Sequence, residues 1–119
     1  MNAKLIGIYG EQTAARYLRQ EKYDILSANF TAGTGEIDIV AEKNNVICFV
    51  EVKTRKEGGM FSPADAVDFR KQNNIKSAAS GFMNKYNLKK EMRFDIIEVL
   101  LQEDNVYNVK KINHLKNVF

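Results

Sequence analysis

Two stretches of the sequence, residues 36–42 and 46–54, limit the fold more than any other feature. Both are rich in β-branched residues and alternate apolar with polar or charged side chains over much of their length, as β-strands do. The polar run Lys43-Asn44-Asn45 separates them, and Asn readily adopts the left-handed backbone of a tight turn. We therefore predict an antiparallel β-hairpin in the middle of the chain.

The register of this hairpin brings charged residues together. If the turn contains two residues, the ladder places Asp38 directly opposite Glu51, and it places Glu36 opposite Lys53. Because side chains alternate between the two faces of a strand, all four lie on one face. The other face is then apolar and is formed by Ile37, Ile39, Val50 and Val52.

The facing acids Asp38 and Glu51 have a chemistry that suits a metal ion. Two like charges directly opposite each other on paired strands cost roughly 0.2 to 1 kcal/mol, and more where water is excluded. Mg²⁺ prefers oxygen ligands and is commonly held by one or two carboxylates, waters and a phosphate. We predict that the two acids bind Mg²⁺ or Mn²⁺, while Lys53 orients or helps to deprotonate the water that attacks a phosphodiester bond.

The first predicted helix, residues 2–20, carries an acid within its apolar stripe. Ile8 and Leu18 lie at helical spacing and bracket Glu11 on one side of the helix. A buried acid needs a partner. We predict that Glu11 reaches the metal site directly or through water, and the alternative is a salt bridge with Lys53 or an arginine.

The remaining elements complete the order α-β-β-β-α-β-β. The capping signal Ser62-Pro63 predicts the start of a second helix that continues to around residue 87. Further strands are predicted over residues 23–30, 92–101 and 106–112. Because no repeat, low-complexity tract or linker interrupts residues 1–119, we predict a single α/β domain with a central mixed sheet of four to five strands and flanking helices.

The composition of the 119 residues limits the class of protein and the cellular compartment. Hydrophobic residues make up 45% and charged residues 28%, which is the balance of an ordinary globular protein. The single Cys48 excludes an internal disulfide and a multi-cysteine zinc site, and it suits a reducing compartment. Since the sequence shows no signal-peptide pattern and no apolar run near the roughly 18 residues of a membrane span, we expect a cytoplasmic protein without a membrane partner. The net charge of +3 permits attraction to a polyanion without specifying one.

Several motifs together resemble known nucleases. The runs GEIDIVA at residues 35–41 and FVEVKTR at 49–55 are similar to the core of the PD-(D/E)xK nuclease superfamily, with Ile37 in place of a proline before Asp38. The closer resemblance is to the YraN-type family, small bacterial proteins similar to archaeal Holliday junction resolvases, and it spans nearly the whole chain. Besides these two strands, the motifs that carry it are Gly10-Glu11, Ala14-Ala15, Lys71, Arg93-Phe94-Asp95 and Ile112-Asn113-His114-Leu115.

This resemblance implies a restriction-endonuclease-like core and metal-dependent cleavage of DNA, with branched DNA such as Holliday junctions as a substrate. The catalytic residues that it implies are Glu11, Asp38, Glu51 and Lys53, of which the three acids bind the metal. A homodimer is a further expectation, since enzymes that act on branched DNA often cut two strands, although no residue of the sequence identifies an interface.

Four further residues are candidates for contacts with DNA. Thr54 and Arg55 follow the predicted active strand and are placed to position a substrate, and the alternative is an exposed strand end. Lys71 and Gln72 lie in the second helix, where their spacing lets them lean toward the sheet and contact a phosphate. Their alternative is a solvated basic helix.

Weaker candidates have plain structural interpretations. Glu36 supports the metal site, pairs with Lys53 or caps the preceding turn. Asp95 is expected in structural pairing, and His114 in packing or at the surface. The loop of residues 55–61 is a hypothesis for a segment that becomes ordered around DNA.

Two alternatives to an enzyme stay open for the chain as a whole. One is a non-catalytic DNA-binding or adaptor protein that retains the nuclease fold. The other is a structural protein whose facing acids are neutralised by lysines alone. The complete set of two acids and a lysine favours the metal-dependent DNA endonuclease.

Overall fold

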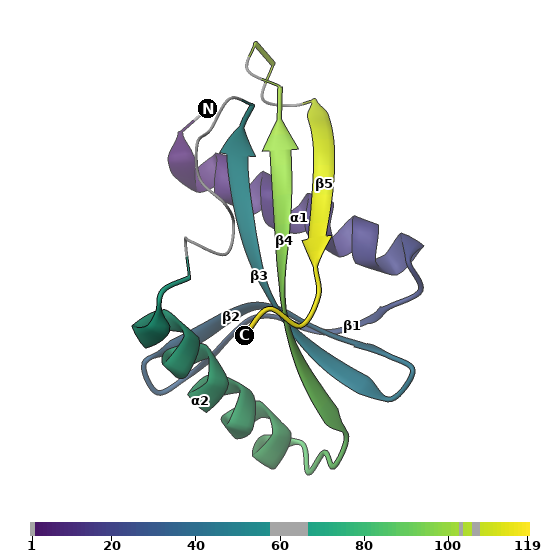
Figure 1. Cartoon of the computed structure of the whole chain (residues 1–119), viewed down its shortest axis with the longest axis vertical. Coiled ribbons are helices and arrows are strands. Elements are labelled where there is room, and N and C mark those ends of the chain that lie inside the picture. Colours follow the sequence, from purple (N-terminus) through teal and green to yellow (C-terminus); the bar gives the residue numbers. More distant parts are fainter. Residues whose placement is uncertain (1, 58–66, 103, 106–107) are drawn as a thin grey trace.

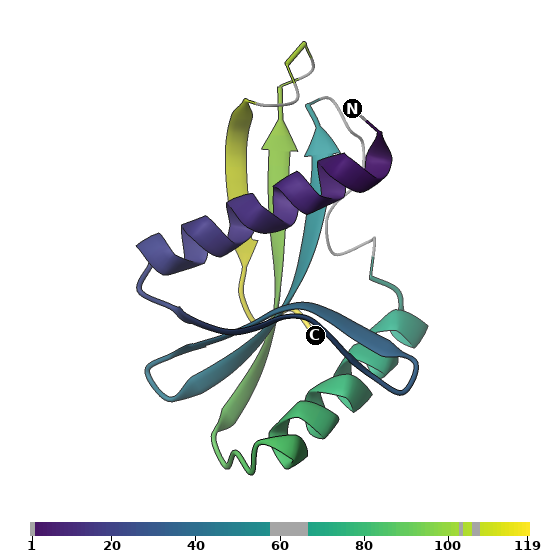
Figure 2. The ribbon, with the colours of Figure 1, turned by 180° about the vertical axis from the view of Figure 1, so that it is seen from behind.

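A computed structural model describes residues 2–57, 67–102, 104–105 and 108–119, and it shows a five-stranded sheet flanked by two helices (Figure 1). The elements are α1 Ala3–Gln20, β1 Asp24–Ala32, β2 Gly35–Lys43, β3 Val46–Lys56, α2 Phe69–Lys85, β4 Glu91–Leu101 and β5 Val109–Leu115. The strands lie in chain order, and of their four described pairings β3 with β4 is the parallel one. Figure 2 shows α1 crossing β3, β4 and β5. The predicted α/β class, element order and mixed sheet are confirmed.

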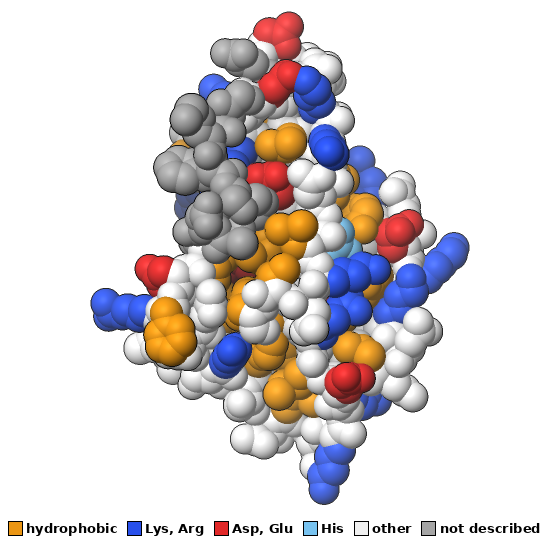
Figure 3. All heavy atoms as spheres, in the orientation of Figure 1, with side chains coloured by type: hydrophobic (Ala, Val, Ile, Leu, Met, Phe, Trp, Pro, Cys, Tyr) orange, Lys and Arg blue, Asp and Glu red, His pale blue; other side chains and the backbone are white. Residues whose placement is uncertain are grey.

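Charged side chains of both signs lie on the face seen in Figure 3. Lys and Arg side chains lie mainly around the edges of this view, and Asp and Glu side chains lie among them. Apolar side chains are exposed in the middle of the face. Because acids are mixed with the bases, the charge of this face alone does not mark a surface for a polyanion.

The central hairpin forms around the predicted two-residue turn. Asn44 and Asn45 have φ angles of 52° and 64°, the left-handed conformation that such a turn requires. The predicted register then holds along the hairpin as far as Ile39, which lies opposite Val50. The turn chemistry of the two asparagines therefore sets the pairing of β2 with β3.

The two strands separate one step before the predicted acid pair. Within the part of the chain that the structure describes, neither Asp38 with Glu51 nor Glu36 with Lys53 is a pair of the ladder, so these two predicted pairings are wrong in detail. The cause is local. The Oδ2 atom of Asp38 accepts a hydrogen bond from the backbone N–H of Val52, with 2.8 Å between oxygen and nitrogen.

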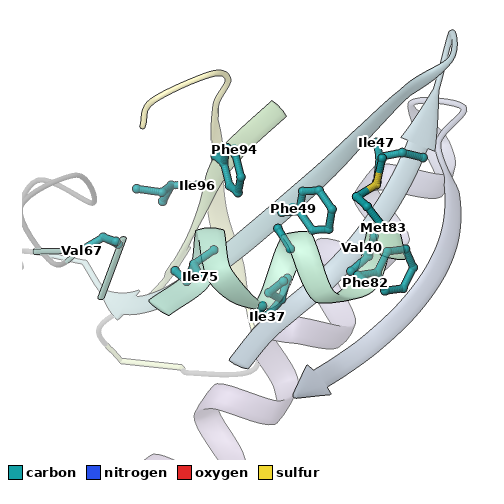
Figure 4. Close-up of a cluster of buried hydrophobic side chains, with 12 residues drawn as sticks. Ile37, Val40, Ile47, Phe49, Val67, Ile75, Phe82, Met83, Phe94 and Ile96 are labelled. Atoms are coloured by element: carbon teal, nitrogen blue, oxygen red, sulfur yellow. The ribbon is translucent and has the colours of Figure 1, made fainter. Parts of the chain in front are cut away.

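Two clusters of buried apolar side chains hold the helices on the sheet. On the α2 face, Ile37 and Phe49 pack with Phe82 of α2 (Figure 4). On the α1 face, Ile39 packs with Leu18 of α1. The apolar stripe of α2 holds that helix as its residue spacing predicts. The stripe predicted for α1 is only partly correct, because Leu18 is buried with Ala14 whereas Ile8 is exposed.

Ile37 lies on the opposite face from the predicted one. The hairpin pattern predicts Ile37 and Ile39 on the same face, but they belong to the clusters on opposite faces. Between them, Asp38 and its neighbour Asn29 are missing from the described β1–β2 ladder, and Asn29 has a φ of 54°. This irregularity interrupts the alternation of side chains, which restarts with the opposite sense.

Both helices begin at side-chain caps. The Oδ1 atom of Asn2 accepts a hydrogen bond from a backbone N–H in the first turn of α1, and Asp68 accepts one from the N–H of Lys71 in α2, at 2.9 and 2.8 Å. The second helix begins later than predicted, because residues 67–68 are not helical and Asp68 supplies the cap. The predicted start at residues 62–63 lies outside the described residues. Neither of the two described helices is long and apolar enough to cross a membrane.

Candidate active site

Among the described residues, β3 has no strand partner on one side beyond the point where β2 leaves it, and we call this stretch its open edge. β3 pairs with β4 along its whole length to Lys56, but its pairing with β2 ends at Val50. Asp38 occupies the first position after the strands separate, and its carboxylate is bonded to the N–H of Val52. We call the place bounded by Asp38, Glu51 and Val52 the fork. Its backbone geometry holds one carboxylate of the predicted site in a fixed position.

Glu51 is the buried acid of the fork. Its side chain is 7% exposed. The pKa of Glu51 is raised to about 8, first by burial and then by a hydrogen-bond contact with Asp38 and repulsion from it, while Lys71 and Lys53 oppose the shift. The two carboxyl groups are therefore in contact although they are not a ladder pair. Such an arrangement favours a bound proton or a bound cation.

Two lysines flank this pair of acids. The Nζ atom of Lys71, on α2, lies 3.5 Å from an Oε2 of Glu51. Lys53, on β3, is half-buried, and its pKa is lowered first by burial and then by Lys71, although Glu51 and Asp38 partly offset the shift. The structure thus places Lys53 beside the two acids, and it places Lys71, a predicted phosphate contact, against Glu51.

Glu11 reaches the fork because α1 passes very close to β3. A Cβ atom added to Gly10 would lie 1.7 Å from the Oγ1 of Thr54, so the approach depends on glycine. The pKa of Glu11 is raised, first by partial burial and then by repulsion from Asp38 and Glu36. The structure therefore brings Glu11 close to Asp38, and binding of a metal by Glu11 stays a prediction.

Two hollows in the surface meet at Glu11. One, of about 230 Å³, lies between α1 and the β1–β2 hairpin, and Asn29 and Asp38 are among its lining residues. The other, of about 320 Å³, lies beside the first turns of α1 and is lined in part by Lys53 and Lys56. Glu11 thus lines both hollows and Asp38 lines the first, whereas the buried Glu51 is among the lining residues of neither.

The fork fits a hard divalent cation held by two protein carboxylates. Among the residues described, no three His, Cys, Asp or Glu side chains are grouped closely enough to form a metal site on their own. A site with fewer protein ligands is typical of Mg²⁺, which keeps several waters and binds through one or two carboxylates together with substrate phosphate. Asp38 and Glu51 supply such a pair, and Glu11 would act on the cation through water.

Thr54 and Arg55, both predicted to contact DNA, have contacts inside the protein. Thr54 packs against Gly10. The Nε atom of Arg55 lies 3.7 Å from the Oε2 of Glu98, and the Arg55 side chain is 20% exposed. Glu98, which also accepts a hydrogen bond of 3.0 Å from the amide of Asn113, is not among the predicted site residues. The available signal was an acid within the apolar run of residues 94–101.

Gln72, Glu36 and the loop of residues 55–61 are the remaining predicted contributors to the site or to DNA binding. The amide nitrogen of Gln72 donates to the carbonyl oxygen of Val67 at 3.0 Å and so supports the start of α2. Glu36 is exposed and contributes to the site through its charge, which raises the pKa of Glu11. Residues 58–61 of the loop predicted to become ordered around DNA lie outside the described residues. Contact of any of these residues with DNA stays a prediction.

Asp95 and His114 belong to a separate polar cluster between α1 and the C-terminal strands. The carboxylate of Asp95 accepts hydrogen bonds from Arg93, at 2.9 and 2.8 Å, and lies 2.8 Å from the Nε2 of His114. Tyr17 contacts the other ring nitrogen of His114 at 3.0 Å, and Tyr23 accepts from Arg93 at 2.8 Å. We call these five residues the anchor cluster. Asp95 thus has the structural pairing that the sequence predicts.

The fold and the fork define a small α/β protein with a cluster of acids and lysines at an open sheet edge. Residues 10–99 match the model of the Uncharacterised protein family UPF0102, and the chain belongs to this family. The matched residues include Glu11, Asp38, Glu51 and Lys53.

Curated relatives match the chain over nearly its whole length. A UPF0102 protein of Caldanaerobacter subterraneus subsp. tengcongensis is 43% identical over 120 residues, which cover 100% of this chain and 98% of the relative. A UPF0102 protein of Caldicellulosiruptor bescii is 42% identical over 122 residues, with both chains covered completely. A UPF0102 protein of Porphyromonas gingivalis is 40% identical over 113 residues, or 95% of this chain and 82% of the relative. The comparisons thus support the same family along the whole chain.

Proposed function

We propose that this protein is a metal-dependent endonuclease of the PD-(D/E)xK type, which hydrolyses phosphodiester bonds in DNA. The contact between the buried Glu51 carboxyl and Asp38, at an open sheet edge and beside two lysines, carries the proposal. Two acids in contact are costly without a positive partner, and a divalent cation is the partner that their oxygen atoms suit. The sequence resemblance to this superfamily supports the same chemistry.

In this proposal Asp38 and Glu51 would hold the divalent cation, which would supply polarisation of the phosphate and a lower pKa for a water molecule. Asp38 is oriented for this task by the N–H of Val52, which occupies one lone pair of Oδ2 and leaves the rest of the carboxylate for a ligand. Glu51 is held from the neighbouring position of β3. The protein thus presents two oxygen ligands from two strands whose backbones are already in place.

Lys53 lies on the same strand, two residues after Glu51, and therefore on the same face. Its amino group, beside the two acids, is placed to orient the attacking water and to balance the charge that develops on the phosphate. Glu11, from α1, supports the site by holding a water or the cation's hydration shell. Mg²⁺ and Mn²⁺ both suit these oxygen ligands.

The proposed substrate is DNA, with branched DNA as the preferred form. The similarity of the YraN-type family to Holliday junction resolvases supports this choice, and it is an analogy at the level of fold. Lys56 and Lys53 line the hollow beside Glu11 and offer positive charge to a backbone phosphate. A homodimer is part of the same proposal.

The experiment is incubation of the purified protein with linear, single-stranded, flapped and four-way DNA in Mg²⁺, Mn²⁺ or EDTA. We expect cleavage in the metal buffers and none in EDTA. Asp38→Asn and Lys53→Ala should each abolish cleavage, whereas the matched controls Asp104→Asn and Lys89→Ala, at exposed positions, should cleave like the unchanged protein.

The outcomes separate an enzyme from a binding protein. Cleavage that survives both Asp38→Asn and Lys53→Ala would show that the activity arises elsewhere. DNA binding without cleavage of any of the four substrates, in either metal, would favour a non-catalytic DNA-binding or adaptor protein with the same fold.

A further inference from the structure

Lys71 holds a position that a metal ion would compete for. Its ammonium nitrogen lies 3.5 Å from the Oε2 of Glu51, the buried acid of the fork. We propose that Lys71 neutralises Glu51 while the fork holds no divalent cation, and that it gives up this contact when the cation binds. Lys71 and the metal then compete for the carboxylate of Glu51. The inference rests on the proposed function, because it needs a cation at the fork.

The geometry of Glu51 makes the two partners exclusive. A cation shared with Asp38 takes lone pairs of the Glu51 carboxylate, and its double charge repels an ammonium group at the same oxygen. Glu51 is 7% exposed, so few other positions around its carboxylate are free for a second positive ligand. One positive partner therefore has to leave when the other arrives.

Lys71 is the lysine that can leave. Its side chain is 43% exposed, so solvent can receive the ammonium group without any change in the core. Lys53 instead starts from the middle of β3, whose backbone is paired with β4 at that residue. Lys71 thus contacts Glu51 from a helix outside the sheet, whereas Lys53 belongs to the same strand as Glu51.

The backbone of Lys71 stays in place while its side chain moves. The N–H of Lys71 donates to Asp68, and the side chain of Gln72 donates to the carbonyl of Val67, so the first turn of α2 is held by two hydrogen bonds. Only the side-chain dihedral angles need to change. The released ammonium group remains within a side chain's length of the cation, where a phosphate of the substrate binds, so metal binding would prepare a phosphate contact.

The test is the affinity for Mn²⁺ alone, measured by isothermal titration calorimetry on the full chain without DNA. Lys71→Met removes the competing charge, and Arg70→Met removes the same charge from the neighbouring, exposed position of α2. At a pH above 8, where the Glu51 carboxyl is deprotonated, we expect Lys71→Met to bind Mn²⁺ about three- to tenfold more tightly than the unchanged protein, because the binding-competent state is no longer shared with the ion pair. Arg70→Met should stay close to the unchanged protein.

Thermal unfolding supplies a second readout. In EDTA, Lys71→Met should melt below the unchanged protein, because Glu51 has lost its partner, and saturating Mn²⁺ should reduce that difference. Lys71→Gln, which keeps a polar side chain of similar length, should show the same gain in Mn²⁺ affinity if Lys71→Met folds poorly.

The outcomes distinguish this inference from the proposed function. If the unchanged protein binds Mn²⁺ but both Lys71 variants bind it equally or more weakly, the competitor role is wrong while the metal site stands. If neither the unchanged protein nor any variant binds Mn²⁺, the metal site of the proposed function fails as well.

Discussion

Two buried acids on neighbouring strands, Glu51 on β3 and Asp95 on β4, have opposite electrostatic surroundings. Burial alone would raise the pKa of Asp95, but hydrogen bonds from His114, Arg93 and the N–H of Asn117 outweigh it and hold the pKa at about 2. Asp95 is fully buried, and its charge is matched by groups that donate to it. It is an acid with a complete set of partners.

Glu51 is buried to a similar degree, at 7% exposure, but its neighbour is another carboxyl group. Burial and Asp38 together raise its pKa to about 8, and two lysines only partly offset the shift. The protein therefore bears a cost at the fork that it avoids in the anchor cluster. A buried acid whose partners are complete stabilises the fold, whereas one that faces another acid indicates a binding site.

The largest effect that would test this difference is expected from Asp95→Asn. The substitution leaves Arg93 and His114 without their carboxylate, and breaking a buried, hydrogen-bonded charge pair typically costs about 3 to 5 kcal/mol. Urea unfolding at neutral pH measures the loss, with Asp104→Asn at an exposed position as the control. A loss below about 1 kcal/mol would mean that the anchor cluster does not stabilise the fold.

Glu51→Gln should increase the free energy of unfolding, whereas Asp95→Asn should decrease it. Because the folded pKa of about 8 lies above the ordinary value of 4.5, the stability linked to Glu51 is full below pH 4.5 and is lost as the pH rises to about 8. In EDTA, Glu51→Gln should remove this loss and raise the free energy of unfolding above pH 8 by up to about 5 kcal/mol, because each pKa unit corresponds to about 1.4 kcal/mol.

Urea unfolding of both proteins from pH 5 to 9 measures the divergence. We expect the two curves to separate with rising pH, and saturating Mg²⁺ should stabilise the unchanged protein but not Glu51→Gln. If the free energies of unfolding of the two proteins instead change in parallel over this range, the pKa of Glu51 is not raised by folding.

The smallest effect is expected from Tyr17→Phe. The change removes one hydrogen bond, between the Tyr17 hydroxyl and the Nδ1 of His114, and leaves the contacts of Asp95 intact. A typical hydrogen bond contributes about 0.5 to 1.5 kcal/mol to stability. A loss in the free energy of unfolding well above that range would mean that the hydroxyl holds the whole anchor cluster together, and not His114 alone.

The hairpin shows how far local chemistry predicts this fold. Asn44 and Asn45 set the turn, and with it the register of β2 and β3 up to the fork. From that register we predict that Asp38 and Glu51 are neighbours. In the structure they are not paired in the ladder, but their carboxyl groups are in contact. The close approach that Gly10 permits explains why the acid next to it also reaches this place.

What the sequence did not predict depends on packing between distant segments. The irregularity at Asn29, which moves Ile37 to the α2 face, has no signature in the alternation of β2 itself. The contact of Lys71 with Glu51 requires the position of α2 over the sheet, which no local pattern specifies. The pairing of Arg55 with Glu98 likewise joins two strands that lie far apart in the chain.

The most direct test of the fork as a cation site is the titration of the Glu51 side-chain carboxyl by ¹³C NMR, in EDTA and in Mg²⁺. The midpoint in EDTA should lie near pH 8, while that of Asp95 lies near 2. Because a metal ligand must be deprotonated, Mg²⁺ should shift the Glu51 midpoint to lower pH and leave Asp95 unchanged. A Glu51 midpoint near 4.5 in EDTA, or one that Mg²⁺ does not move, would contradict the assignment of the fork as a metal site.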